Sequence, residues 1–582
     1  MHSDQTLSSD RIGLWVFATL GLLLALRLAV ILVSPMELYA DEAQYWRWGQ
    51  SLEWGYYSKP PMIAWVIHAT TSVFGNDEWA IRLAAPFLHT LAAASLFLLG
   101  RAMFGATAGA MAAIGYAVMP GVMLSSTVIS TDGVLLPVWS LALLMFWQLR
   151  SGDGRWLSAI GLGLAMGVGM LSKYAMVYFL IGMVLTLLFD RPSRKALLSL
   201  NGGLALIVAA IVVAPHFAWN AANDFKTVSH TLDNANLEGP LLNPENAITF
   251  IVDQMGVFGP VSFLGLIGGL IFMTRSGEQE RGQKERWLMA FIVPALVIIM
   301  IEAVVSRAHA NWAATAYPAA SILIASFFLR ASANRWLWFS IAGLTLIAFQ
   351  LAPDVNAIVK LAIGVTTAIA ILIVGMRSHY RPVGLFWSGL TLHAVLGVIM
   401  MGMLVAPPAW TAVAGLDNAL KRTRGWEAMA EQVVTAAKET GASAVMVDER
   451  EIWHGIDYYA RGRLDVPLIA WRYNPGIKSF SETEMLTDAD DDNVLIASYR
   501  PNRRPRIRAD FNSFDYLRDL SVALGQRSNG CPIERRLALY LGSGFEPLPR
   551  DAAWLEAYDG MVEGAPPPCP AQDDAAATEE TG

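Results

Sequence analysis

The first 406 residues alternate between long apolar runs and short polar connections. Thirteen runs are apolar enough to form membrane helices, for which about 20 apolar residues are needed. They cover residues 12–34, 79–101, 106–129, 133–149, 156–172, 174–189, 197–219, 247–273, 287–305, 312–329, 336–352, 355–376 and 384–406. The pattern therefore predicts an α-helical polytopic membrane protein with about 13 transmembrane helices.

Basic residues gather in every second connection between these runs. The basic connections hold Arg101; Arg150 and Arg155; Arg191, Arg194 and Lys195; Arg275, Arg281, Lys284 and Arg286; Arg330 and Arg335; Arg377 and Arg381. Cytoplasmic loops carry such an excess of Lys and Arg. We therefore predict a multi-pass membrane protein with its N-terminus in the cytoplasm and its C-terminal region on the opposite side, which in a bacterial inner (plasma) membrane is the periplasm.

The polar and apolar pattern changes near residue 411. Residues 411–550 combine mixed charge with short apolar runs, including a helical periodicity over Trp426–Thr440 and buried-strand patterns over 442–447 and 493–498. This pattern predicts a periplasmic α/β domain. Residues 551–582 are rich in Ala, Pro, Glu and Asp and predict a flexible tail.

The composition argues against nucleic-acid binding and leaves open whether the two cysteines form a disulfide. The chain is 54% hydrophobic and 16% charged, with a formal net charge of −7, so no basic surface for nucleic acid is expected. Cys531 and Cys569 are the only cysteines, without the spacing of a zinc or iron–sulfur site. In an oxidising compartment they form either a disulfide or two unpaired thiols.

Within the predicted transmembrane module 1–410, residues 37–61 have an unusual composition. This run, ELYADEAQYWRWGQSLEWGYYSKPP, lies in the predicted periplasmic loop 35–78 and mixes Asp41, Glu42 and Lys59 with seven aromatic residues. Interface charges near a membrane helix are commonly just solvated. Aromatic neighbours, however, raise the proton affinity of a carboxylate, as a general base requires.

This run resembles the first extracytoplasmic loop of the C-type (GT-C) lipid-dependent glycosyltransferases. It is most similar to the bacterial branch that contains the aminoarabinose transferases of lipid A and related protein mannosyltransferases. The resemblance implies a GT-C fold in a bacterial inner (plasma) membrane and a sugar donor carried on polyprenyl phosphate. It also implies an acceptor in the cell envelope, which is a glycolipid such as lipid A, another glycan or a protein, and an inverting single displacement.

The resemblance assigns roles to residues of the loop. Asp41, with Glu42 beside it, is the expected catalytic carboxylate that binds or deprotonates the acceptor hydroxyl, and Lys59 is the expected ligand of the donor phosphate. Aromatic residues expected to bind substrate are Tyr45, Trp46, Tyr56 and Tyr57. Ser58 stands where the aminoarabinose branch commonly has a Glu that can bind metal, which argues against a metal at this place and against aminoarabinose as the sugar.

Two further segments carry residues that match the family. Asp132, in Ser130-Thr131-Asp132, is expected to support catalysis, although Thr131 or Asp132 could instead cap the following helix. Lys173 lies between two apolar runs, where an ammonium is costly unless it reaches water, a carboxylate or a phosphate. We expect Lys173 to bind the donor phosphate or to form a structural ion pair.

The segment SRAHANW supplies the last candidates. Arg307 is expected to bind the donor phosphate in a bidentate fashion, with His309 and Asn311 as substrate ligands. The alternative is a polar turn between two helices. His216 and His230, at the start of the long loop 220–246, lack the paired spacing of a metal site. No cofactor is certain, and a divalent cation (Mg²⁺ or Mn²⁺) remains open.

The sequence leaves two functional classes to compare. One is a glycosyltransferase that moves a sugar from a polyprenyl phosphate to an envelope acceptor, and the other is a transporter or flippase of lipid-linked sugars. A transporter places its polar residues near the middle of the bilayer, often in repeated halves. Here the distinctive residues gather at one predicted face, which favours the enzyme.

Overall fold

The structure is a computed structural model of the 582-residue chain. It describes residues 2–153, 155–233, 242–272, 279–306, 308–333, 335–351, 356–406, 408–413, 415–474, 476–477, 479–483, 486, 492–527 and 531–564. The chain divides into two compact units. The helical unit comprises Met1–Ser34, Leu52–Ala352 and Ala357–Val405, and the C-terminal unit comprises Pro35–Ser51, Pro353–Asn356 and Ala406–Gly582.

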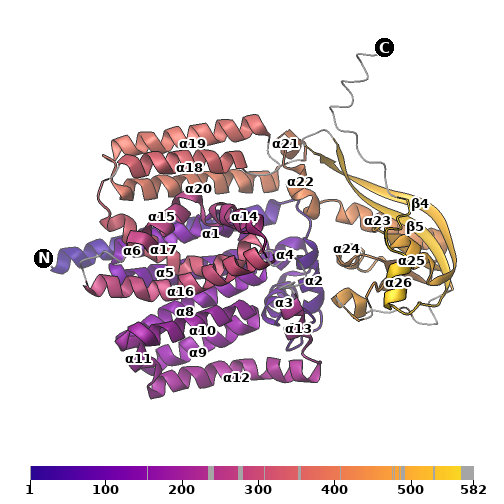
Figure 1. Cartoon of the computed structure of the whole chain (residues 1–582), viewed down its shortest axis with the longest axis horizontal. Coiled ribbons are helices and arrows are strands. Elements are labelled where there is room, and N and C mark those ends of the chain that lie inside the picture. Colours follow the sequence, from indigo (N-terminus) through magenta and orange to yellow (C-terminus); the bar gives the residue numbers. More distant parts are fainter. Residues whose placement is uncertain are drawn as a thin grey trace, which may run out of the picture. The chain divides into compact units, whose positions relative to one another are not determined.

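The helical unit is a bundle of long, side-by-side helices (Figure 1). Its elements are α1 (His2–Val33), α3 (Met62–Phe74), α4 (Glu78–Arg82), α5 (Ala84–Phe104), α6 (Ala106–Ala117), α7 (Pro120–Ser125), α8 (Thr131–Ser151), α9 (Arg155–Ser172), η1 (Tyr174–Met176), α10 (Val177–Phe189), α11 (Arg191–Leu197), α12 (Leu200–Ala222), α13 (Lys226–Asp233), α14 (Pro244–Phe258), α15 (Pro260–Phe272), α16 (Gln279–Val305), η3 (Ala310–Ala316), α17 (Tyr317–Arg330), α18 (Arg335–Leu351), α19 (Ala357–Arg377) and α20 (Pro382–Val405).

The predicted multi-span helical architecture is confirmed. Within the described residues, eight helices are long and apolar enough to cross a membrane, or ten if each of two bent pairs is one span. Each of the thirteen predicted runs contains helix, but some are short or interrupted. The run 106–129 breaks between α6 and α7, and the run 247–273 bends by 112° between α14 and α15. The apolar helix α3 was not among the predicted runs.

These interruptions have local physical causes. Arg27 of α1 is buried and donates to the carbonyl oxygen of Ala117, at the end of α6. Because a helix end leaves carbonyls without intrahelical partners, this guanidinium stabilises the break in the bundle interior. At the α14–α15 bend, Gly259 has φ +88°, and a Cβ there would lie 2.0 Å from the ring of His393. The bend therefore requires glycine.

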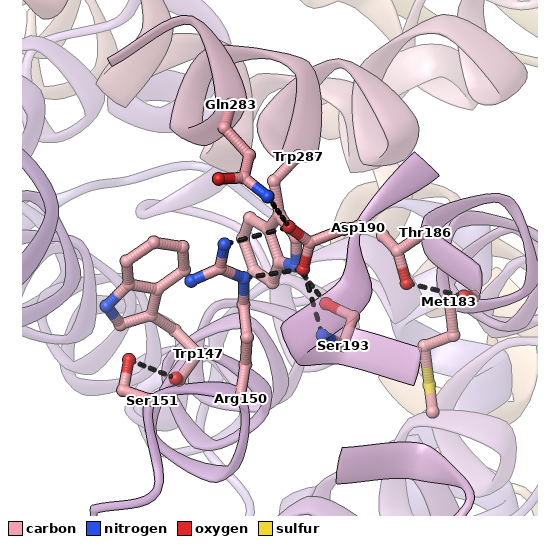
Figure 2. Close-up of polar contacts among 9 residues, drawn as sticks. All are labelled: Trp147, Arg150, Ser151, Met183, Thr186, Asp190, Ser193, Gln283 and Trp287. Atoms are coloured by element: carbon pink, nitrogen blue, oxygen red, sulfur yellow. Dashed lines mark hydrogen bonds and ion pairs between the residues drawn. The ribbon is translucent and has the colours of Figure 1, made fainter. Parts of the chain in front are cut away.

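A buried ion pair joins α8 to α11 and α16 (Figure 2). Arg150, in the last turn of α8, binds both carboxylate oxygens of Asp190 at 2.7 and 2.8 Å. Asp190 is also the N-cap residue of α11, since its carboxylate accepts from the backbone N–H of Ser193, and it accepts from the amide of Gln283 as well. Trp147 lies against the Arg150 guanidinium, 4.4 Å from carbon to ring centre. This pair fixes the end of the bundle at which α8 ends.

The C-terminal unit combines helices with one five-stranded sheet in the order β2-β1-β3-β5-β4. Strands β1–β3 are parallel and β5 and β4 antiparallel, with β4 and β5 forming a long hairpin (Figure 1). The elements are α2 (Ala40–Gly49), α21 (Pro408–Val413), α22 (Asp417–Leu420), η4 (Lys421–Thr423), α23 (Trp426–Thr440), β1 (Ala444–Val447), α24 (Arg450–Tyr459), β2 (Leu468–Ala470), η5 (Phe480–Thr483), β3 (Val494–Ser498), α25 (Arg504–Arg508), β4 (Phe511–Gln526), β5 (Pro532–Phe545) and α26 (Ala552–Ala557).

The small sheet beyond the helices agrees with the predicted α/β region. Helix α23 has the predicted bounds, and β1 and β3 fall within the predicted strands. Helix α26 occupies the start of the predicted tail, while residues 565–582 lie outside the described part of the chain. Cys531 is disulfide-bonded, which favours the first of the two cysteine alternatives, and Cys569 lies outside the described residues.

Candidate active site

The first turn of α8 presents Asp132 at the end of the helical unit opposite the Arg150 pair. Ser130 is the N-cap residue of α8, since its hydroxyl accepts from the backbone N–H of Gly133 at 3.1 Å. The expectation that Thr131 or Asp132 caps this helix is therefore wrong. With the cap supplied by Ser130, the carboxylate of Asp132 turns to other partners.

Those partners come from two distant segments of the chain. Lys173, which follows the last residue of α9, places its ammonium 2.7 Å from one carboxylate oxygen of Asp132. Asn311, in η3, donates its amide to the other oxygen at 2.6 Å. The ammonium and the amide thus occupy different oxygens of one carboxylate. The candidates Asp132, Lys173 and Asn311 are brought together, and Lys173 has the structural ion pair that its position required.

Lys173 also lines a cavity of about 250 Å³. Lys59, from the loop between α2 and α3, lines the same cavity, so two predicted phosphate ligands share one space. The wall is completed by Ser58, Pro60, Tyr174, Ala175, Tyr178, Ile299, Glu302 and Trp312. The cavity thus combines two ammonium groups and one carboxylate, that of Glu302, with phenol, indole and aliphatic side chains. The two cations and the apolar wall suit a phosphate attached to a lipid.

Sequence reasoning missed Glu302 and Tyr178 as cavity residues. Glu302 is a half-buried acid in the apolar last part of α16, and Tyr178 is in the first turn of α10. A single carboxylate within the apolar run IIMIEAVV was the available signal, because acids inside membrane helices are commonly functional. Tyr178 gave no comparable signal, since aromatic residues are common in such helices.

Tyr56 and Tyr57 lie beside Lys59 in the loop but are not among the cavity residues. Tyr56 is buried, and its hydroxyl oxygen accepts from the backbone N–H of Glu53 at 3.1 Å. Burial raises the pKa of Tyr56 to about 12, so its hydroxyl stays protonated. Tyr57 is half-buried. A substrate-binding role for either residue stays a prediction.

Asp41 and Glu42 belong to α2 in the C-terminal unit. Glu42 is buried, and its carboxylate accepts from the backbone N–H of Tyr39 at 3.0 Å in a capping box. This contact gives Glu42 a helix-capping function. Asp41 is 60% exposed and forms an ion pair with Arg450 of α24 at 2.9 Å. Burial works to lower the pKa of Arg450, but the charge and hydrogen bond of Asp41 outweigh it and raise the pKa above its ordinary value.

The aromatic side chains of α2 pack within the C-terminal unit. Trp46 meets Tyr458 of α24 edge to face, with ring centres 4.9 Å apart, and Tyr45 lies against Trp48. Both Tyr45 and Trp46 are buried. These contacts give both side chains a packing role, and their contact with substrate stays a prediction.

The SRAHANW segment divides between described and undescribed residues. His309 is exposed and packs edge to face on Trp312, which lines the cavity. Arg307, the predicted phosphate ligand, lies outside the described residues.

Two of the predicted carboxylates, Asp132 and Glu42, each bind partners within their own unit. In the described part of the chain, no three His, Cys, Asp or Glu side chains are grouped to hold an ion. The carboxylate of Asp132 already binds Lys173 and Asn311, and that of Glu42 caps α2. These residues do not fit Mg²⁺ or Mn²⁺, which favour several oxygen ligands.

Comparison with known proteins gives consistent results. Residues 58–219 match the family model of dolichyl-phosphate-mannose-protein mannosyltransferases. The lipid A galacturonosyltransferase RgtD of Rhizobium johnstonii is 34% identical over 360 residues, which cover 59% of this chain and 75% of that protein. The lipopolysaccharide core galacturonosyltransferase RgtA of the same organism is 29% identical over 37% of this chain and 44% of its own. The crystal structure of ArnT from Cupriavidus metallidurans bound to undecaprenyl phosphate matches with a TM-score of 0.63 and 15% identity, over 90% of this chain and 98% of that chain.

The fold and these similarities define a polytopic membrane glycosyltransferase of the C type, the class that takes its sugar from a polyprenyl-phosphate carrier. Within this class, the chain belongs to the family of RgtD. The resemblance drawn from residues 37–61 is thereby confirmed, and the enzyme is favoured over the transporter or flippase.

Proposed function

We propose that this enzyme transfers a galacturonosyl residue from a polyprenyl-phosphate donor to the lipid A or core region of lipopolysaccharide. The named activities of RgtD and RgtA support the choice of sugar and acceptor. Ser58, in place of the Glu common in the aminoarabinose branch, agrees with a sugar other than aminoarabinose.

The observation that carries the proposal is the cavity shared by Lys59 and Lys173. A glycosyl phosphate reacts when its phosphate leaves, and cations near that phosphate stabilise the developing charge. An ammonium has three N–H donors, and Lys173 gives one to Asp132. The ion pair thus orients Lys173 while leaving it donors for a phosphate oxygen. In this proposal Asp132 and Asn311 position Lys173, and the phosphate lies between Lys173 and Lys59.

Asp41 keeps the predicted role of acceptor carboxylate. In an inverting single displacement, the acceptor oxygen forms a bond to the anomeric carbon while the bond from that carbon to the phosphate oxygen breaks. The acceptor proton passes to a carboxylate, and polyprenyl phosphate leaves. Asp41 is exposed enough to meet a hydroxyl, and Arg450 holds its orientation.

The two ends of the helical unit support a periplasmic location for this chemistry. Three predicted cytoplasmic cations, Arg101, Arg150 and Lys284, line one hollow of about 660 Å³ where α8 ends. Asp132 and Lys173 lie at the other end of α8. By the rule that cytoplasmic loops are rich in Lys and Arg, we place the Arg150 end in the cytoplasm of a bacterial inner membrane and the cavity at the periplasmic face.

The test is transfer by purified protein in detergent, with polyprenyl phosphate linked to galacturonic acid as donor and lipid A as acceptor. The proposal expects product with the wild type and a strong loss with Asp41→Asn and Lys59→Met. Detergent removes the bilayer, so a transporter or flippase would give no product. Adding a chelator, Mg²⁺ or Mn²⁺ to the same assay tests the metal requirement. Transfer of other sugars but never galacturonic acid would disprove the proposed sugar.

A further inference from the structure

His216 connects the two segments that carry the cavity lysines. It is fully buried in α12, two turns from the end of that helix. Its Nδ1 lies 2.6 Å from the backbone carbonyl oxygen of Trp54, in the loop that leads to Lys59. Its Nε2 lies 2.7 Å from the hydroxyl of Tyr174, the residue after Lys173. One imidazole therefore contacts both of the segments that carry the cavity lysines.

The partners of His216 fix its protonation at each nitrogen. A carbonyl oxygen can only accept, so Nδ1 carries the hydrogen and donates to Trp54. In the neutral ring Nε2 is then an acceptor, and the hydroxyl of Tyr174 donates to it. Asn220, one turn further along α12, places its amide 3.2 Å from Nε2 and donates to the backbone oxygen of His216 at 3.1 Å. The ring orientation is thus set from within α12.

Other contacts hold the same loop against α12 and α13. Trp219 donates its indole N–H to the carboxylate of Glu53 at 2.8 Å, and Thr227 donates to the carbonyl oxygen of Tyr56 at 2.6 Å. A Cβ on Gly55 would lie 2.3 Å from the ring of Trp219, so the loop backbone lies directly on that indole. The loop backbone before Lys59 is therefore held in place by its contacts with α12 and α13.

We propose that His216 is a positioning residue that sets the separation of Lys59 and Lys173 and thereby the affinity of the cavity for a lipid-linked phosphate. The inference deepens the proposed function and rests on it. His216 itself is not among the residues that line the cavity, so it acts through the Trp54 carbonyl and the Tyr174 hydroxyl. Two lysines that share one phosphate must keep a separation that matches it, since short displacements weaken charge-assisted hydrogen bonds.

Two conservative variants break the same hydrogen bond from opposite sides. In His216→Asn the amide nitrogen takes the place of Nδ1 and keeps the donor to Trp54, but the acceptor for Tyr174 is gone. In Tyr174→Phe the donor is gone and the histidine stays. The probe is undecaprenyl phosphate in detergent micelles, with Kd measured for each variant, for the double variant and for His216→Ala.

Each conservative variant is expected to raise Kd about threefold to tenfold, the range for one lost hydrogen bond. The double variant should bind no worse than the weaker single variant, because both changes remove one interaction. His216→Ala, which also loses the Trp54 contact, should raise Kd by more than about tenfold. Effects that multiply in the double variant, or single variants that bind like the wild type, would overturn the inference.

Tyr116→Phe is the matched control. Tyr116, like the half-buried Tyr174, has its hydroxyl close to a histidine nitrogen, at 3.1 Å from that of His89, but Tyr116 is fully buried and does not line the cavity. Its loss should leave Kd unchanged, and an equal rise in Kd would mean that any buried Tyr–His bond has this effect, against the inference. A wild type that fails to bind undecaprenyl phosphate overturns the proposed function as well. A wild type that binds, with His216 variants that bind equally well, overturns only the role of His216.

Discussion

The two ends of α8 carry ion pairs of opposite character. At its end, Arg150 binds Asp190, whose side chain has no solvent exposure and whose two oxygens accept from an arginine, an amide and a backbone N–H (Figure 2). At its start, Asp132 binds Lys173, whose side chain is 22% exposed and lines a cavity. The ends lie about 30 Å apart along the 21-residue helix.

From this difference we propose that the first pair is structural and the second functional. A buried carboxylate with four donors has no capacity left for a ligand, so Arg150 and Asp190 hold α8, α11 and α16 together. Lys173 has donors beyond the one that Asp132 receives and faces a cavity that a second lysine shares. We expect changes at the first pair to alter stability and changes at the second to alter transfer.

The largest expected effect is on stability, at the Arg150 end. Asp190→Asn leaves the Arg150 guanidinium buried without its counter-charge, which should destabilise the protein by about 3–5 kcal/mol. Thermal unfolding in detergent measures the change. Removing both charges in Arg150→Met/Asp190→Leu should recover part of the loss. If Asp190→Asn unfolds like the wild type but no longer transfers sugar, the assignment of this pair is wrong.

The next effect is on transfer, at Lys59. Lys59→Met should lower kcat/KM for the donor about 100-fold, a typical cost of removing one group that stabilises a developing charge. Its free energy of unfolding should change by less than about 1 kcal/mol. Lys284→Met is the matched control, because Lys284 lies at the other end of the bundle and pairs with the exposed Glu280. An equal loss of kcat/KM in Lys59→Met and Lys284→Met would mean that removing any positive charge lowers transfer, which would contradict a specific role of Lys59.

Asp132→Asn should have a smaller effect on transfer than Lys59→Met. It gives the clearest comparison between the Asp132–Lys173 pair and the Arg150–Asp190 pair. The amide keeps the size of the side chain but no longer orients the ammonium of Lys173 by charge, so transfer should fall about tenfold, as for one charge-assisted hydrogen bond. Unfolding should be affected much less than in Asp190→Asn, because Lys173 retains access to water. Destabilisation as large as that of Asp190→Asn would make both pairs structural.

Asn311→Ala should give the smallest effect. Asn311 is exposed and supplies one hydrogen bond to Asp132, so transfer should fall about threefold. The KM for the donor is measured for Asn311→Ala and for Asp132→Asn, and the comparison shows whether Asn311 acts through Asp132. A loss larger than that of Asp132→Asn would show that Asn311 contacts substrate directly.

The sequence predicted the helical architecture because membrane helices need uninterrupted apolar length. It did not predict the breaks after α6 and at Gly259, since they depend on Arg27 and His393, which are distant in sequence. It missed the β4–β5 hairpin because the burial of β4 does not alternate along the strand. The hairpin is stabilised by the pairing of β4 with β5, which the hydrophobic periodicity of β4 alone does not indicate.

The candidate site was predicted in part. Lys59, Asp132 and Asn311 were proposed from the family resemblance, and Lys173 also because an ammonium between two apolar runs is costly unless it finds a partner. Their partnership was not, since it joins α8, α9 and η3 through tertiary contacts. Glu42 has a structural role that the sequence analysis did not predict, since three residues after Tyr39 it occupies the position of a capping box. Its catalytic role stays a prediction.

The central claim is that Lys59 and Lys173 bind the donor phosphate, and the most direct measurement compares undecaprenyl phosphate with uncharged undecaprenol. Binding of both lipids is measured in detergent for the wild type and for Lys59→Met/Lys173→Met. The account predicts that the wild type prefers the phosphate by at least about tenfold, as expected for charge-assisted hydrogen bonds, and that the double variant binds both lipids alike. A double variant that folds and keeps the wild-type preference would contradict it.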